Sequence, residues 1–129
     1  MSTILIVDDD QEILALVKKR LENHGYQTLT ACDGEEALYQ IDLQKPDIIV
    51  LDVSMPVING FEVCARLKGD ASTRHIPVLM LTGHIRYTDK KIAEHCGADG
   101  YIPKPYSAQL LLDEIARHLY QSPGLPANE

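Results

Sequence analysis

The stretch Thr3-Ile4-Leu5-Ile6-Val7-Asp8-Asp9-Asp10 is a short apolar run that ends abruptly in three acids. Four further apolar runs follow it along the chain, at residues 26–31, 48–51, 78–81 and, more weakly, 100–102. Nearly continuous runs of Val, Ile and Leu are typical of strands that are buried on both faces of a sheet. The sequence therefore predicts five strands, three of them strongly apolar.

Segments with the length and spacing of helices lie between and after these runs. Five helices are predicted, over about residues 11–24, 34–43, 60–68, 89–96 and 108–120. The first is amphipathic and is followed by Gly25, a typical helix stop. Asn59 and Ser107 are candidate N-caps, and Asp33 with Glu36 three residues later forms a capping-box pattern.

Strict alternation of buried strands and helices predicts a parallel sheet with helices on both faces. We therefore expect an α/β fold, a flavodoxin-like, doubly wound (βα)5 three-layer sandwich whose five strands lie in the order 2-1-3-4-5. In such sheets, ligands bind at the carboxyl ends of the strands where the winding reverses, here between the first and third strands.

The composition indicates a single folded domain in 129 residues, expected over residues 1–121, with residues 122–129 as a flexible tail or the start of a linker. A net charge of −7 argues against direct nucleic-acid binding, and no apolar run approaches the roughly 20 residues of a membrane helix. Three widely spaced cysteines without a C-x-x-C pair fit buried, reduced thiols. These features favour a cytoplasmic protein.

Carboxylates follow two of the predicted strands. Asp8, Asp9 and Asp10 come after the first strand, and Asp52 ends the third. Clustered like charges repel one another, whereas Mg²⁺, or Mn²⁺, prefers oxygen ligands and offsets the repulsion. Taken alone, Asp10 could simply cap the first helix, with Asp8 and Asp9 as solvated loop acids. The convergence with Asp52 favours a divalent metal site.

Two further polar side chains come after neighbouring strands, Thr82 after the fourth and Lys104 after the fifth. An ammonium neutralises phosphoryl oxygens, and a hydroxyl donates a hydrogen bond to them. Together with a metal-bound carboxylate, these groups predict a site for a phosphoryl group.

At this point the chain resembles, over about residues 3–120, the receiver domain of bacterial two-component response regulators, and most closely the stand-alone, chemotaxis-regulator type. The motifs that carry the resemblance are Ile6-Val7-Asp8-Asp9, Asp47-Ile48-Ile49-Val50-Leu51-Asp52-Val53-Ser54-Met55-Pro56 followed by Gly60, Leu81-Thr82-Gly83, and Gly97-Ala98-Asp99-Gly100-Tyr101-Ile102-Pro103-Lys104-Pro105. Gly83 departs from the family pattern, in which Ala is more frequent, but the function should survive.

The resemblance implies that Asp52 accepts a phosphoryl group from a sensor histidine kinase, a phosphotransfer protein or a small acyl phosphate. It also implies that Asp9 ligates Mg²⁺ directly and Asp8 largely through water. Asp52 and the main-chain carbonyl of Ser54 complete the implied metal site. Lys104 would pair with the phosphoryl group, in a turn where the Lys104-Pro105 peptide is expected to be cis.

The resemblance further implies a switch in which Thr82 moves toward the phosphoryl group and Tyr101 turns inward behind it. The change would reach a surface built from the helix at 89–96, the strand at 100–102 and the last helix, and would signal to a partner that the sequence does not identify. Ser54 and His84 occupy positions that tune dephosphorylation in this family, although His84 is equally plausible as an exposed loop histidine. Tyr101, too, could be simple packing.

Three alternatives differ in function. A pseudo-receiver would dock a partner without being phosphorylated. An Asp-nucleophile phosphatase would need a second acid where the chain has Ser54, and a flavin protein would need a phosphate loop where the chain has acids. We therefore expect a phosphoacceptor signalling domain rather than an enzyme, either a monomer or a homodimer favoured by phosphorylation. It could be a stand-alone regulator, a phosphorelay intermediate or part of a longer chain.

Overall fold

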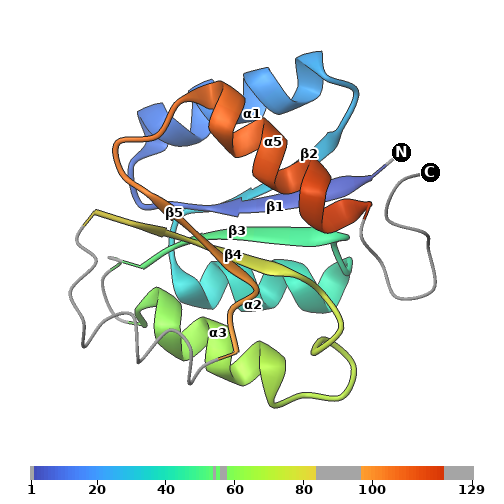
Figure 1. Cartoon of the computed structure of the whole chain (residues 1–129). Coiled ribbons are helices and arrows are strands. Elements are labelled where there is room, and N and C mark those ends of the chain that lie inside the picture. The colour runs from blue at the N-terminus through green and yellow to red at the C-terminus, as the bar shows by residue number, and fades with distance from the viewer. Residues whose placement is uncertain (1, 54, 56–57, 84–96, 121–129) are drawn as a thin grey trace.

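The computed structural model describes residues 2–53, 55, 58–83 and 97–120. Its strands are β1 (Thr3–Val7), β2 (Gln27–Ala31), β3 (Ile48–Asp52), β4 (Val78–Thr82) and β5 (Gly100–Pro103). The helices within these residues are α1 (Gln11–Asn23), α2 (Gly34–Leu43), α3 (Gly60–Lys68) and α5 (Ala108–Leu119) (Figure 1). The helix predicted over residues 89–96 lies outside the described residues.

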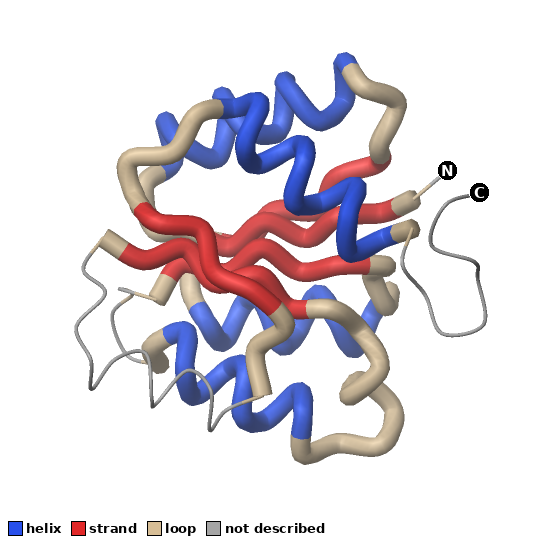
Figure 2. Tube along the Cα trace, viewed as in Figure 1, coloured by secondary structure: helices blue, strands red, loops and turns tan. Residues whose placement is uncertain are grey.

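The five strands form one parallel sheet in the order β2-β1-β3-β4-β5. Helices α1 and α5 cover one face, and α2 and α3 cover the other (Figure 2). This is the predicted flavodoxin-like, three-layer α/β architecture. The strand order reverses at β1, so the carboxyl ends of β1 and β3 meet where a ligand site is expected.

Alternate residues of the central strands face opposite helical layers. Leu5 and Val7 pack against α2 and α3, whereas Ile4 and Ile6 pack against α1 and α5. Strands β3 and β4 divide their residues between the two layers in the same way. Because full burial of one such side chain contributes about 1.5–3 kcal/mol, these strands fix the register of the whole sheet.

The two edge strands differ from the central three. In β2 only Ala31 is buried, which fits its more polar sequence and its place at the edge of the sheet. It begins at Gln27, one residue later than predicted. Strand β5 includes Pro103, which the sequence had suggested as its stop, because an edge strand tolerates a residue that has no N–H to donate.

The predicted helix caps are all present. The side chains of Asp10, Asp33, Asn59 and Ser107 accept hydrogen bonds from main-chain N–H groups in the first turns of α1, α2, α3 and α5. Gly25 has a φ of 90° after α1, in the left-handed region that favours glycine. These local contacts set where each helix begins and ends.

Cys64 is buried and Cys32 is half-buried, and neither forms a disulfide, as predicted. Cys96 lies outside the described residues. No helix in the part of the chain that the structure describes is long and apolar enough to cross a membrane.

Gly60 allows α3 to start directly against the end of β3. A Cβ atom at this position would clash with the main-chain oxygen of Asp52 and would lie 2.9 Å from Cα of Val53. The Gly60 N–H donates to the Val53 carbonyl at 3.1 Å, which holds the two segments together. The backbone around Asp52 is therefore placed by a contact that only glycine permits.

We expect Gly60→Ala to lower the free energy of unfolding by about 2 kcal/mol or more, because backbone rather than a flexible side chain must move. Urea denaturation measures the loss. Gly83→Ala is the matched control: a Cβ there meets no described atom within 4 Å, so its stability should change by less than about 0.5 kcal/mol. Equal stability of the two variants would contradict the conclusion that the contact of Gly60 with the backbone of Asp52 and Val53 requires glycine.

Candidate functional site

The site lies at the carboxyl ends of β1 and β3. Val7 pairs in register with Leu51, so the next residues, Asp8 and Asp52, lie opposite each other at the edge of the sheet. The Asp8 N–H donates to the Ala31 carbonyl at 3.1 Å, which continues the ladder one residue beyond β1. Asp8 directly follows β1 and Asp52 is the last residue of β3, so both acids emerge from the core rather than from a solvated loop.

Asp8 is a buried carboxylate that is only partly satisfied. It is 1% exposed, and its Oδ1 accepts the Asp10 N–H at 2.9 Å. Its Oδ2 accepts no hydrogen bond from the described residues and lies 4.0 Å from Nζ of Lys104. Burial raises the pKa of Asp8 to about 6, with smaller contributions from the charges of Asp52 and Asp9, while the Asp10 N–H and Lys104 oppose the rise.

Asp52 is paired with Lys104. The Asp52 side chain is 4% exposed, and its Oδ1 accepts a hydrogen bond from Lys104 Nζ at 3.1 Å. The main-chain N–H of Lys104 donates to the Thr82 carbonyl at 2.7 Å, which fixes the start of the segment after β5. The Lys104-Pro105 peptide is cis, as predicted.

Three carboxylates gather at this edge of the sheet, and two of them lie within 4.0 Å of the Lys104 ammonium. One oxygen from each of Asp8, Asp9 and Asp52 lies within 4.8 Å of the other two, and Asp9 is the exposed member. The unsatisfied Oδ2 of Asp8 and the hard oxygen donors fit a divalent cation such as Mg²⁺. The cluster predicted from sequence is therefore assembled, whereas Ser54 lies outside the described residues.

Asp10 has a different role from its two neighbours. Its side chain accepts the N–H groups of Glu12 and Ile13 at 3.0 and 3.3 Å and caps α1. The capping explanation is thus right for Asp10, but the buried Asp8 is not a solvated loop acid.

Thr82 and Tyr101 lie on neighbouring strands. Thr82 is buried at the end of β4, and Tyr101 is half-buried in β5 and packs against the α2–α3 side of the core. Tyr101 pairs in register with Met80, two residues before Thr82, so Thr82 and Tyr101 face the same side of the sheet. His84 lies outside the described residues.

Tyr106 is a neighbour of the site that was not predicted. It packs against the α1–α5 side of the core, and burial raises the pKa of its hydroxyl, as do the nearby charges of Asp8 and Asp52. Its signal in the sequence is only an aromatic residue directly after Lys104-Pro105, which ordinary packing explains as well.

The family model for the response regulator receiver domain matches residues 4–116. The chain belongs to this family. Among curated relatives, it is 45% identical over 104 residues to the alkaline phosphatase synthesis transcriptional regulatory protein PhoP of Bacillus subtilis, covering 81% of this chain and 42% of that protein. It is 39% identical over 109 residues to response regulator MprA of Mycobacterium tuberculosis, covering 84% and 46%. The chain thus spans about half the length of these curated relatives.

Solved receiver structures share the fold. The signal receiver domain of a signal transduction histidine kinase from Syntrophus aciditrophicus has a TM-score of 0.90 and 35% identity, covering 100% of this chain and 98% of that one. The chemotaxis protein CheY4 of Vibrio cholerae has a TM-score of 0.86 and 35% identity, covering 91% and 98%. The predicted receiver fold is confirmed.

We expect the metal-free receiver to lose stability as the pH rises toward 7, because of Asp8. Its folded pKa of about 6 lies above the ordinary value of 3.8, so the folded state holds a proton that the unfolded state releases. The free energy of unfolding should fall between about pH 4 and 6.5, by at most about 3 kcal/mol. Urea denaturation in EDTA at several pH values measures this slope, the change in the free energy of unfolding with pH.

Asp8→Asn should remove most of this slope and make the metal-free protein more stable than the wild type at pH 7. Asp42→Asn removes an exposed acid of α2 and should leave the slope unchanged. If the free energy of unfolding of Asp8→Asn fell with pH as steeply as that of the wild type, the pH dependence would belong to other groups.

Proposed function

We propose that this receiver accepts a phosphoryl group on Asp52 from a sensor histidine kinase, a phosphotransfer protein or a small acyl phosphate. The observation that supports this best is the Asp52–Lys104 pair, with Oδ1 and Nζ 3.1 Å apart, beside a buried Asp8 oxygen that accepts no hydrogen bond from the described residues. A structural ion pair would not require two further acids at the same edge of the sheet.

In the proposed reaction a carboxylate oxygen of Asp52 attacks the phosphorus of the donor. For a phosphohistidine the new P–O bond forms as the P–N bond breaks, and the imidazole nitrogen keeps the electron pair. The product is an acyl phosphate on Asp52. Attack of water on its phosphorus would later restore the carboxylate and release phosphate, and Ser54 and His84 are proposed to tune this step.

Asp8, Asp9 and Asp52, with the main-chain carbonyl of Ser54, would hold Mg²⁺ or Mn²⁺. The bound cation would neutralise charge on the phosphoryl oxygens. Lys104 already contacts Asp52, so its ammonium is placed to pair with a phosphoryl oxygen there. Asp8 Oδ2 accepts no hydrogen bond from the described residues and belongs to the same group of carboxylates, so it would help to hold the cation near Asp52.

The proposed response passes through β4 and β5. Thr82 is the last residue of β4, the strand beside Asp52, and its main-chain carbonyl accepts a hydrogen bond from the Lys104 N–H. Movement of the Thr82 hydroxyl toward a phosphoryl group would open space on the side of the sheet where Tyr101 lies. The phosphoryl group would favour one of two packings of β5, α5 and residues 89–96, which form the proposed partner surface.

The chain would act as a phosphoacceptor signalling domain in the cytoplasm rather than as an enzyme with a separate substrate. Its net charge of −7 supports a protein partner over direct contact with nucleic acid. Phosphorylation could favour a homodimer through the β5–α5 surface.

We expect incubation with Mg²⁺ and acetyl phosphate to add one phosphoryl group, detected by intact mass. Asp52→Asn should gain none, and EDTA should abolish the adduct on the wild type. Asp42→Asn removes an acid remote from the site and should be modified like the wild type. Because hydrolysis can hide the adduct, beryllofluoride binding is followed in parallel by NMR. If neither reagent acted on the wild type, the pseudo-receiver would replace this proposal.

We expect Thr82→Ala to retain the adduct but to lose most of the shift changes that beryllofluoride causes at Tyr101 and along α5. The reason is that the hydroxyl, rather than the acceptor, carries the change across the sheet. Thr28→Ala, in the edge strand β2, is the control and should respond like the wild type. Unchanged shifts at Tyr101 in Thr82→Ala would remove Thr82 from the switch.

A further inference from the structure

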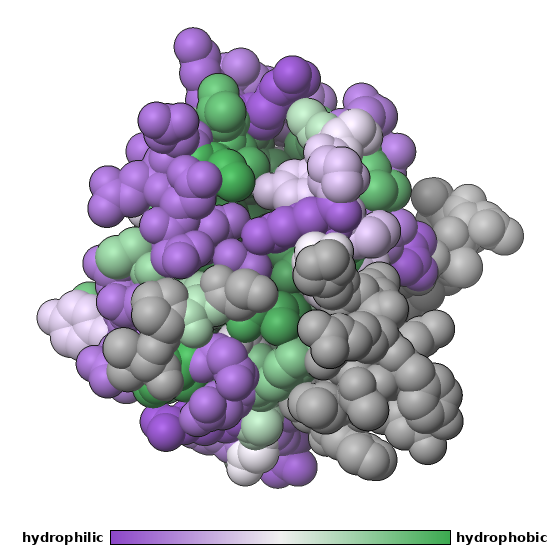
Figure 3. Space-filling view, turned by 90° about the vertical axis from the view of Figure 1, so that its left-hand side faces the viewer, coloured by the Kyte–Doolittle hydropathy of each residue, from purple (hydrophilic) through white to green (hydrophobic). Residues whose placement is uncertain are grey.

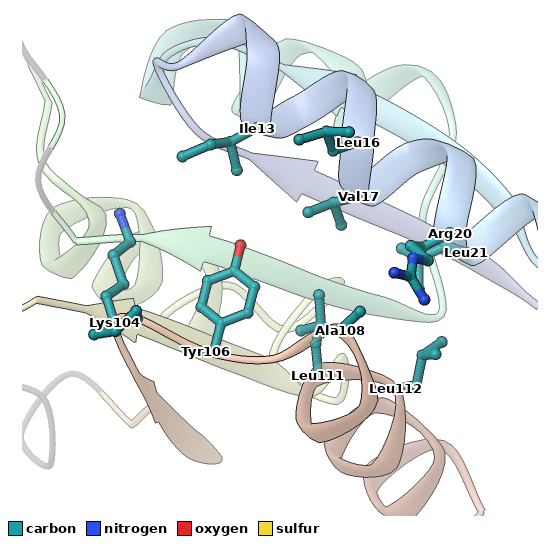
Figure 4. A pocket seen from close by; sticks show the side chains of 11 residues that line it. Ile13, Leu16, Val17, Arg20, Leu21, Lys104, Tyr106, Ala108, Leu111 and Leu112 are labelled. Atoms are coloured by element: carbon teal, nitrogen blue, oxygen red, sulfur yellow. The ribbon is translucent and has the colours of Figure 1, made fainter.

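A groove of about 580 Å³ separates α1 from α5, on the face of the sheet opposite α2 and α3. Figure 4 shows side chains from both helices and from the segment after β5 pointing into it. Its lining residues are Ile13, Leu16, Val17, Arg20, Leu21, Lys104, Pro105, Tyr106, Ala108, Leu111 and Leu112. The volume lies within the range of about 300–1,000 Å³ that small-molecule sites occupy.

The walls of the groove are apolar, and its rim is accessible. Val17, Leu21 and Leu111 are buried and belong to the core, so the floor is rigid. Leu16 stands at the rim and is 69% exposed. Figure 3, which faces the carboxyl ends of the strands, shows hydrophobic residues among hydrophilic ones in its upper half, where α1 and α5 lie, and others nearer its centre. Ala108 leaves space where a larger residue would fill the groove.

The charged groups of the lining are both cations, although the chain carries a net charge of −7. Lys104 is committed to Asp52 at 3.1 Å. Arg20 forms no ion pair with a described residue, and its side chain extends from α1 at the edge of the groove (Figure 4). The groove therefore combines an apolar surface with a guanidinium, at one end, that no described carboxylate neutralises.

Tyr106 adds a polar group between the two cations. Its ring packs against the core, and its hydroxyl points across the groove toward α1 (Figure 4). A few polar groups around an apolar pocket are what orient a small ligand. Cationic and hydrogen-bond donating groups select for an anion.

We propose that this groove binds a small organic anion with an aromatic or branched aliphatic body. The body lies between α1 and α5, and a carboxylate or sulfonate pairs with Arg20. The groove is present without phosphorylation of Asp52, so the proposal is tested on the unphosphorylated chain and does not depend on whether Asp52 accepts a phosphoryl group.

The test uses 1-anilinonaphthalene-8-sulfonate and its uncharged analogue N-phenyl-1-naphthylamine on the whole unphosphorylated chain. NMR titration gives the dissociation constant and the residues that respond. The sulfonate should bind more tightly than the neutral analogue, with shifts at Leu16, Tyr106 and Leu112. Equal affinities, or shifts confined to other surfaces, would overturn the proposal.

Two kinds of variant test separately the contribution of the Arg20 charge and the contribution of the space in the groove. Arg20→Gln should weaken sulfonate binding by about three- to fivefold, the worth of an exposed ion pair, and should leave the neutral analogue unaffected. Lys19→Gln removes the same charge from α1 outside the lining and should change neither. Ala108→Phe should fill the groove and weaken both ligands by at least about tenfold.

Arg20→Gln keeps the test valid if Ala108→Phe fails to fold. Sedimentation velocity then tests whether a second copy of the chain occupies the groove instead of a small anion. A wild-type dimer that Arg20→Gln dissociates would assign the groove to a second copy of the chain and overturn the proposal, whereas a monomer that binds the sulfonate supports it.

Discussion

The crowding of three carboxylates at one edge of the sheet, two of them within 4.0 Å of the Lys104 ammonium, is the constraint on which the site depends. A parallel sheet delivers the ends of β1 and β3 to one edge, so Asp8 and Asp52 approach each other whatever their charges. Burial then raises the pKa of Asp8 to about 6 and leaves one of its oxygens without a hydrogen bond from the described residues. The fold tolerates this cost because apolar burial in the central strands is far larger. A divalent cation held at this edge, as proposed above, would relieve the same cost.

The alternation of strand side chains separates two groups of polar residues. Asp8, Asp52 and Lys104 continue the positions that face α1 and α5, whereas Thr82 and Tyr101 continue those that face α2 and α3. The groups meet through the backbone, where the Lys104 N–H donates to the Thr82 carbonyl at 2.7 Å. A change at the acids therefore has a short covalent and hydrogen-bonded route to the other face.

The sequence predicted the sheet order, the caps and the approach of the Asp8, Asp9 and Asp52 carboxylates and of Lys104 to one edge of the sheet, because all of these depend on where strands and helices end. Residue type and spacing alone could not separate the environments of Asp8, Asp9 and Asp10, which are identical residues in a row. One is buried, one is exposed and one caps α1, and this depends on how the backbone turns after Val7. Tyr106 was missed for a similar reason, because its closeness to the acids arises only when the segment after β5 folds back.

The segment Lys104-Pro105-Tyr106 belongs both to the acidic site and to the groove between α1 and α5. Lys104 extends from the groove lining to Asp52, and Tyr106 lies close enough to sense the charges of Asp8 and Asp52. An occupant of the groove that favours one placement of the Lys104 ammonium would alter the charge balance at Asp52. Linkage is reciprocal, so under the two proposals a phosphoryl group that draws Lys104 to itself would change the affinity of the groove by the same factor. A shared lysine is thus sufficient to couple two sites without any movement of the sheet.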